Sequence, residues 1–295
     1  MAAVASAASQ IAASRGLPID TNTNTPSWVE QVPLPLDEDS RKLFIEYAKI
    51  PEAELEKHLI EARMRAWECC PYPCIGHWLF LMLQLRKNPE FEEAVRRTRQ
   101  GHKLLDIGCA VGQDLRDLPE HPQAHAGAPQ TMLYGIDLIE HFFEAGKFLF
   151  RDPDVQITFR QADVLEPDAL QDWRGNFSIV TCNYVFHLMG IEDQEKLAGA
   201  ILKLLSGKPD DLVFGRTGGT EGEGRHEAFR EDLKLYRHST KSMEELWTCV
   251  AAKYGRKAVV ESWIDPSPLP QSHWALAINK DFEPVRNLIF SVRLS

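Results

Sequence analysis

An apolar run that ends in a glycine-bearing turn is the part of the sequence best suited to holding a nucleotide-like ligand. Residues 104–112 read Leu-Leu-Asp-Ile-Gly-Cys-Ala-Val-Gly, with an acid at Asp106 and glycines at Gly108 and Gly112. Glycine lets the chain turn tightly and lets a ligand approach the backbone, and a helix that follows presents N–H groups to anionic atoms. We therefore expect Asp106, Gly108 and Gly112 to shape a ligand site.

Polar residues also follow the next three apolar runs. Asp137 can accept hydrogen bonds from two ribose hydroxyls, and Asp163 is suited to accepting one from an adenine amino group. Leu138, Val164 and Asn183 complete the expected ligand edge, because open α/β sheets bind ligands where their strands end. Structural alternatives stand beside both acids, since Asp137 is also a favoured helix N-cap and Asp163 a common turn residue.

The texture of the chain after Lys103 predicts the fold that positions these residues. Short apolar runs alternate with amphipathic stretches, which is typical of βαβ units around a parallel sheet. The expected strands are 103–107, 132–137, 156–161, 177–182, 211–215, 258–263 and 288–294, and the expected helices are 113–118, 139–151, 191–205 and 242–254. We predict an α/β fold with a doubly wound, seven-stranded, mostly parallel, Rossmann-like sheet. Residues 121–130 are expected to form a surface insertion.

Three regions are expected along the chain. Residues 1–36 are predicted to be a flexible tail, residues 37–100 a helical cap and residues 101–295 the ligand-binding domain. The cap pattern begins at 37 and predicts further helices at 52–67, 75–85 and 89–99.

Composition excludes several classes of partner. The 295 residues have a formal net charge of −10, which disfavours nucleic acid as a partner because such binding depends on Lys and Arg neutralising phosphates. The six cysteines form neither a disulfide ladder nor metal knuckles, and no apolar stretch is long enough to span a membrane. The first 25 residues make a poor secretory signal. We expect a cytoplasmic protein with no membrane span.

The ordered set of motifs resembles the class I S-adenosylmethionine-dependent methyltransferases over residues 103–295. The resemblance implies that S-adenosyl-L-methionine is the cofactor, with Asp106, Gly108 and Gly112 at its amino-acid end, Asp137 at the ribose and Asp163 at the adenine. A narrower resemblance reaches back to about residue 38 and is to small fungal enzymes that methylate carboxyl or hydroxyl groups of polyketide and meroterpenoid intermediates. The segments that carry it are 70–75, 112–116, 186–188, 215–216 and 236–238.

Four residues outside the cofactor motifs are candidates for the acceptor side. His187 could act as a general base toward a hydroxyl, because its ordinary pKa lies near neutral pH. Arg216 and Arg237 could hold a substrate carboxylate, and His238 is a further candidate. Each has a structural alternative as an ordinary buried or surface residue. A carboxylate acceptor is already ionised and needs no base, so the acceptor class stays open between carboxyl and hydroxyl.

Other functions are weighed against this one. A nicotinamide-dependent oxidoreductase is disfavoured because Ala110 stands where its fingerprint needs a second glycine. A non-catalytic partner protein with the same fold stays an alternative. No metal is expected, since Cys69, Cys70 and Cys74 lack a fourth ligand at knuckle spacing. The expected partner is a small-molecule substrate, and a homodimer is left open.

Overall fold

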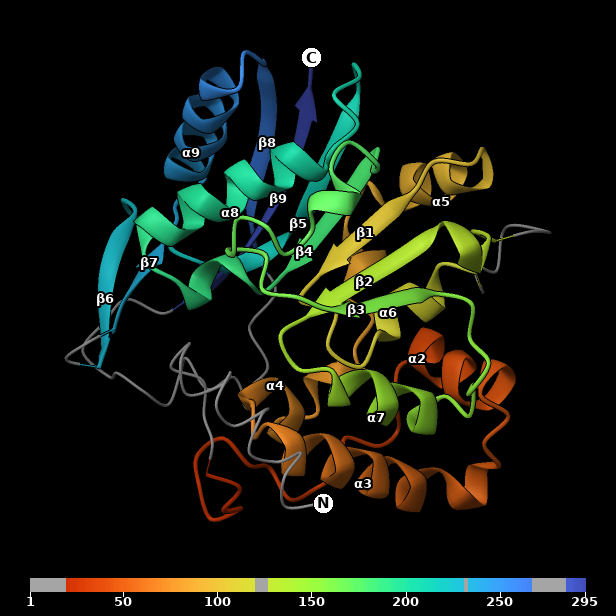
Figure 1. Cartoon of the computed structure of the whole chain (residues 1–295). Helices are drawn as coiled ribbons and strands as arrows, with labels where there is room; N and C mark the ends of the chain where they lie inside the picture. The colour runs from red at the N-terminus through yellow and green to blue at the C-terminus, as the bar shows by residue number, and fades with distance from the viewer. Residues whose placement is uncertain (1–19, 120–126, 231–232, 267–284) are drawn as a thin grey trace.

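The computed structural model describes residues 20–119, 127–230, 233–266 and 285–295. A seven-stranded sheet in the order β3-β2-β1-β4-β5-β9-β8 forms its centre (Figure 1). Its strands are β1 (Leu104–Ile107), β2 (Leu133–Asp137), β3 (Thr158–Gln161), β4 (Ile179–Asn183), β5 (Asp211–Gly219), β8 (Ala258–Asp265) and β9 (Arg286–Leu294). Neighbouring strands are parallel except that β9 runs antiparallel to both β5 and β8. The predicted seven-stranded α/β fold is confirmed.

The central strands are buried on both faces, which is why they are nearly continuous apolar runs in the sequence. Every residue of β1 and of β5 is buried. Strand β5 continues four residues beyond its predicted end at 215, because β9 pairs with it along all nine residues. Arg216 therefore lies inside a strand and not in the loop after one.

Helices cover the two faces of the sheet. On one face α8 (Ile191–Leu204) and α9 (Thr240–Lys253) pack against alternate strand residues such as Leu105 and Val180. On the other face α5 (Phe91–Arg99) and α6 (Gln113–Asp117) pack against Leu104 and Ile179. The helices α5 to α9, including α7 (His141–Leu149), lie within two residues of their predicted bounds.

The predicted N-terminal helical region is present. It contains α2 (Glu38–Lys42), a π-helical turn η1 (Leu43–Tyr47), α3 (Glu52–Cys69) and α4 (Pro73–Gly76), and 3₁₀ turns η2 (Leu79–Leu81) and η3 (Leu85–Lys87) lead from it into α5. Helix α3 packs along α7, and a separate apolar cluster joins them. In Figure 1, α3 and α4 lie beyond the end of the sheet toward which the arrows of β1 and β2 point.

The predicted helix at 75–85 is wrong. The chain forms the short α4 and the turn η2 there, with Trp78 between them in the left-handed region at φ 62°. Its indole N–H donates to the carbonyl of Val29, and a Cβ at Gly76 would lie 1.8 Å from the carbonyl oxygen of Ser27. Contacts with residues 20–36 thus override the local helical pattern.

Residues 20–36, expected to belong to the tail, pack against this region. The indole N–H of Trp67 donates to the carbonyl of Thr21, and Val32 is buried. Residues 1–19 lie outside the described part of the chain. Of the predicted insertion at 121–130, residues 121–126 also lie outside it, while the turn η4 (Gln130–Met132) leads into β2.

A hairpin that the sequence did not predict forms a separate two-stranded sheet. Strands β6 (Arg225–Arg230) and β7 (Leu233–Arg237) pair antiparallel after β5. Strand β7 contacts the 3₁₀ turn η6 (Phe186–Leu188) at the end of β4, and the amide of Tyr236 donates to the carbonyl of Met189. The hairpin thereby reaches the carboxyl edge of the sheet. Among the helices described, none is long and apolar enough to cross a membrane.

Candidate cofactor and acceptor site

The glycine turn after β1 is built so that side chains are excluded where the sequence has glycine. Gly108 and Gly112 have φ of 73° and 72°, and a Cβ on Gly108 would lie 2.5 Å from a methyl group of Val185. The amides of Gly108 and Cys109 both donate to the carbonyl of Ile136, which fixes the turn on β2. The turn therefore presents bare backbone at the carboxyl edge of the sheet.

Asp137 holds the same turn from the tip of β2. Its Oδ2 accepts the amide N–H of Ala110 at 2.9 Å and its Oδ1 accepts that of Ile139 at 3.1 Å. Burial raises the pKa of Asp137 to about 6, although the amides that donate to it act in the opposite direction. A carboxylate accepts about four hydrogen bonds, so Asp137 can accept a further donor and the capping reading and the ribose reading are compatible.

Asp106 is buried beneath the turn. Its Oδ1 accepts a hydrogen bond from the hydroxyl of Thr181 on β4 at 2.8 Å. Burial, and secondarily the carboxyl of Asp114, raise its pKa well above the ordinary range, while the Thr181 hydroxyl lowers it. The side chain thus belongs to a polar layer between β1, β4 and α6.

Asp163 forms the turn that its alternative reading describes. Its Oδ1 accepts the amide N–H of Leu165 at 2.9 Å. Val164 packs against the apolar core on the α8 side, and Leu138 packs against the helical region. Contact of Asp163, Val164 and Leu138 with a cofactor remains a prediction.

The tip of β4 carries backbone strain. Tyr184 lies in the left-handed region at φ 57°, and its hydroxyl donates to Oδ1 of Asn287 on β9 at 2.9 Å. Non-glycine residues in this region cost energy and are concentrated at functional sites. Asn183 precedes it in register with Arg216, and its buried Nδ2 lacks a hydrogen-bond partner among the described residues.

Arg216 and Thr217 are adjacent on β5 and point to opposite faces of the sheet. Arg216 is 2% exposed and donates from Nη1 to Oε1 of Gln84 at 3.0 Å. The next residue, Thr217, lies 3.2 Å from Nδ1 of His187 through its hydroxyl. The Tyr184 side chain lies near both candidates, since its ring centre is 5.9 Å from that of His187 and the charge of Arg216 acts on its hydroxyl.

The hydrogen bonds of His187 define its tautomer. The amide N–H of Gly218 lies 3.3 Å from Nδ1, and an amide can only donate, so Nδ1 is the acceptor. A neutral ring then carries its proton on Nε2. Arg237 donates to the carbonyl of His187 at 3.3 Å, so the hairpin brings these two candidates together.

His238 is placed elsewhere, at the start of α9. Its Nδ1 lies 2.9 Å from the hydroxyl of Ser242, and it is 1% exposed. Burial lowers its pKa to about 4, which keeps the ring neutral at physiological pH.

Two family models match this architecture. One, described as the N-terminal domain of meroterpenoid methyltransferases, matches residues 28–81, and a methyltransferase domain matches residues 104–208. The methyltransferase prhM of Penicillium brasilianum is 35% identical over 233 residues, 77% of this chain and 81% of that protein. The chain belongs to the S-adenosylmethionine-dependent methyltransferases related to these fungal enzymes.

Further relatives agree with this membership. The O-methyltransferase atr3 of Stereocaulon alpinum is 34% identical over 90% of this chain and 75% of its own length. The Asnovolin E/Chermesin D methyltransferase nvfJ of Aspergillus novofumigatus is 32% identical over 77% of this chain and 81% of its own length. The predicted family is confirmed. The chain is a methyltransferase, and not a nicotinamide-dependent oxidoreductase or a non-catalytic partner protein.

The helical region brings a segment of this methyltransferase close to the cofactor acids. Burial raises the pKa of Cys70 to about 12, and the nearby carboxyl of Asp137 contributes. Burial is the main cause of the raised pKa of Tyr72. The charge of Asp137 also raises it, and that of Arg237 lowers it. Tyr72 in segment 70–75 is therefore within range of the charges of both Asp137 and Arg237.

Three residues near the site carry polar contacts that sequence reasoning did not assign. Asp114 accepts the amide N–H of Leu85 at 2.9 Å, Gln84 meets Arg216, and Thr217 meets His187. Only Asp114 left a signal, because it lies in segment 112–116 of the narrower family resemblance. Within the described residues, no group of three His, Cys, Asp or Glu side chains is arranged to hold a metal ion.

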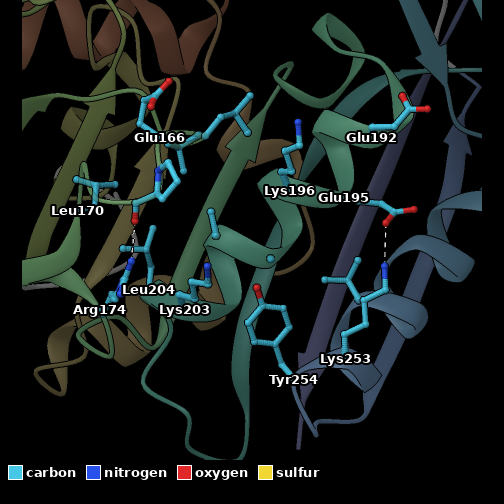
Figure 2. Close-up of a pocket in the computed structure, with 16 residues that line it drawn as sticks. Glu166, Leu170, Arg174, Glu192, Glu195, Lys196, Lys203, Leu204, Lys253 and Tyr254 are labelled. Carbon is cyan, nitrogen blue, oxygen red and sulfur yellow. Dashed lines mark hydrogen bonds and ion pairs between the residues drawn. The ribbon is translucent and has the colours of Figure 1, made fainter.

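A groove of about 500 Å³ lies apart from these residues (Figure 2). It runs between segment 164–174, α8 and α9, and Glu195 and Lys253 form an ion pair of 2.9 Å at its side. Its lining includes Val164 and neither Asp106 nor Asp137. The groove therefore shares Val164 with the predicted cofactor residues but not the acids of β1 and β2.

Proposed function

We propose that this methyltransferase transfers a methyl group to a carboxylate oxygen of a small natural-product intermediate. The relatives named above support an oxygen acceptor and a natural product, since atr3 is named an O-methyltransferase and nvfJ a methyltransferase of named metabolites. The observation that carries the carboxylate reading is the hydrogen bond from the Gly218 amide to Nδ1 of His187.

This hydrogen bond bears on catalysis because it leaves the proton on Nε2. The ring can then donate from Nε2 to an anionic acceptor. To take up a proton at Nε2, the ring would have to carry its other proton on Nδ1, where that N–H would face the N–H of Gly218. A carboxylate is ionised at neutral pH and needs no base. Arg237 beside His187 supplies a cation that favours such an anion.

The residues of the turn fit the cofactor. Close packing against Val185, Arg116 and Phe159 requires glycine at 108 and 112 and so keeps the turn tight, and a remaining lone pair of Asp137 suits a ribose hydroxyl. We propose that Asp106, Gly108, Gly112 and Asn183 serve the amino-acid end, Asp137 and Leu138 the ribose, and Asp163 and Val164 the adenine. The sulfonium of S-adenosylmethionine supplies an electrophilic methyl group.

The chain's own contribution is then mainly positioning. His187 and Arg237 would orient the acceptor so that its oxygen approaches the methyl carbon in line as the carbon–sulfur bond breaks. Positioning of this kind can supply about 7 to 11 kcal/mol of the barrier in the best cases. Arg216 is proposed to bind a carboxylate group of one of the bound ligands. His238 is proposed to hold the start of α9 in place beside the site.

The test uses methyl-labelled cofactor and a panel of polyketide and meroterpenoid acids and phenols. We expect labelled products by mass spectrometry, and mild base should release the label because it cleaves esters but not ethers. Label that survives base would establish a hydroxyl acceptor and overturn the carboxylate reading.

The variant His187→Ala separates the two chemistries by rate. With a carboxylate acceptor we expect kcat to fall by about 10-fold or less, because only a donor is lost. A fall of about 100-fold or more, confined to pH above the histidine pKa, would instead identify a general base. His187→Gln, which retains a side-chain N–H donor, is the matched control and should recover part of the rate.

Three broader predictions also stand as proposals. The division into 1–36, 37–100 and 101–295 is testable by limited proteolysis. A cytoplasmic location is supported by cysteines that are all free thiols, three of them buried, and is testable with a fluorescent fusion. Whether the protein is a homodimer or a monomer is testable by light scattering.

A further inference from the structure

Unpartnered donors on two neighbouring strands form the most informative polar feature outside the assigned contacts. Asn183 on β4 and Arg216 on β5 are direct neighbours in the parallel register. Nδ2 of Asn183 and both Nε and Nη2 of Arg216 are buried and have no hydrogen-bond partner among the described residues. Buried donors are paired in nearly all native proteins, so three in one place indicate a ligand that supplies acceptors.

The direction of the Arg216 side chain places these donors next to the glycine turn. Its Nη1 donates to Gln84, and the charge of its guanidinium lowers the pKa of Asp114 on α6. Helix α6 begins directly after Gly112. The donors therefore lie on the α6 face of the sheet.

Acceptors stand on the same face. Asp106 is bonded to Thr181, which is two residues before Asn183 and so shares its face of β4. Asp114 lies in the first turn of α6, and Gln113 beside it has a buried Oε1 without a partner among the described residues. The cluster thus combines donors for an anion with acceptors for a cation, which matches a zwitterionic α-amino acid.

We infer that Arg216 and Asn183 bind the α-carboxylate of the cofactor's amino-acid end, with the carboxyl of Asp106 on the side of its α-ammonium group. Arg216 then serves the cofactor, and the acceptor carboxylate is left to His187 and Arg237. This inference requires that S-adenosylmethionine binds at the strand tips and does not depend on which oxygen is methylated.

Calorimetric titration with two ligands tests the assignment without turnover. One ligand is S-adenosylhomocysteine, and the other is its decarboxylated analogue, in which hydrogen replaces the α-carboxylate. The wild-type protein should prefer the first by roughly 10- to 100-fold. In Arg216→Met this preference should shrink to within about 3-fold, while the affinity for the decarboxylated analogue stays nearly unchanged.

Control variants keep the result interpretable. Arg216→Lys should retain part of the preference, and Lys253→Met, at the separate groove beside α8 and α9, should retain all of it. If Arg216→Met does not fold, as judged by its melting curve, Asn183→Leu removes the second donor and should also reduce the preference.

Two outcomes would overturn the inference. One is an Arg216→Met protein that loses affinity for both ligands equally, which would show a structural role. The other is an unchanged preference with a raised KM for the acceptor, which would assign Arg216 to the substrate. A wild-type protein that binds neither ligand would count against the cofactor site as a whole.

Discussion

Asp137 shows how one residue can organise both a turn and a ligand contact. Its two oxygens hold the amides of Ala110 and Ile139, so the carboxylate joins the glycine turn to the segment that leads into α7. Ala110 has φ of 47°, a conformation that an alanine rarely adopts, and its bond to Asp137 helps to hold it there. The ribose would therefore meet a carboxylate that is already fixed in place.

Replacing this residue should damage cofactor binding strongly. We expect Asp137→Ala to weaken S-adenosylhomocysteine binding by about 100-fold or more, because bonds to a charged acceptor are lost along with the anchor of the turn. Calorimetry measures the change. Asp137→Asn keeps the size and one acceptor and should lose less, whereas near-normal affinity in Asp137→Ala would show that the ribose lies elsewhere.

Predictability at this scale depends on how far apart the contacting residues are in the chain. The acids at strand ends could be predicted because the strand pattern and the residue that ends it are adjacent in sequence. The face of Arg216 could not, since the strand was expected to stop at 215 and alternation was not extended to it. Its contact with Gln84 spans 132 positions, and no local pattern reports such a pair.

Among the elements, the region around α3 depends on a stacked cation. The guanidinium of Arg63 lies 3.5 Å from the ring centre of Trp28 and 3.7 Å from that of Trp78, and it donates to the carbonyl of Val29 at 2.6 Å. This stack joins residues 20–36, α3 and the turn after α4. The sequence pattern at 75–85 predicted a helix because a local pattern carries no information about these distant contacts.

Removing the stacked cation should loosen this region. We expect Arg63→Ala to lower the free energy of unfolding by about 2 to 4 kcal/mol, through the loss of a buried cation–π contact and a hydrogen bond. Chemical denaturation followed by tryptophan fluorescence measures it. Lys57→Ala, an exposed change on the same helix, should stay within about 0.5 kcal/mol. Equal midpoints for both variants would contradict the role of the stack.

At the scale of the whole molecule, Asp106 and Asp114 are both buried toward the carboxyl edge of the sheet in a chain with a net charge of −10. Burial raises the pKa of Asp114 to about 7, although the Leu85 amide and the Arg216 cation lower it. A carboxyl whose pKa is raised on folding stabilises the protein fully below its unfolded pKa, and that stability is lost as pH rises through the folded pKa. The pKa of His238 is lowered on folding, so its contribution to stability is present above the ordinary histidine pKa and is lost as pH falls.

A variant comparison isolates the contribution of Asp114. Relative to the wild type, we expect the melting temperature of cofactor-free Asp114→Asn to rise progressively as pH increases from about 4 to 7, because the amide cannot ionise. Differential scanning fluorimetry across this range measures the difference, and the exposed Asp154→Asn serves as control. A difference that does not grow with pH would show that Asp114 is not held protonated.

The position of β9 has a consequence for synthesis. This strand lies between β5 and β8, and both of these neighbours precede it in the chain. A growing polypeptide on the ribosome must therefore carry β5 with an unsatisfied edge until residues 286–294 emerge, and such an edge is a template for pairing with other chains. Slow elongation over the codons for residues 286–294 would lengthen the period in which nascent chains can aggregate.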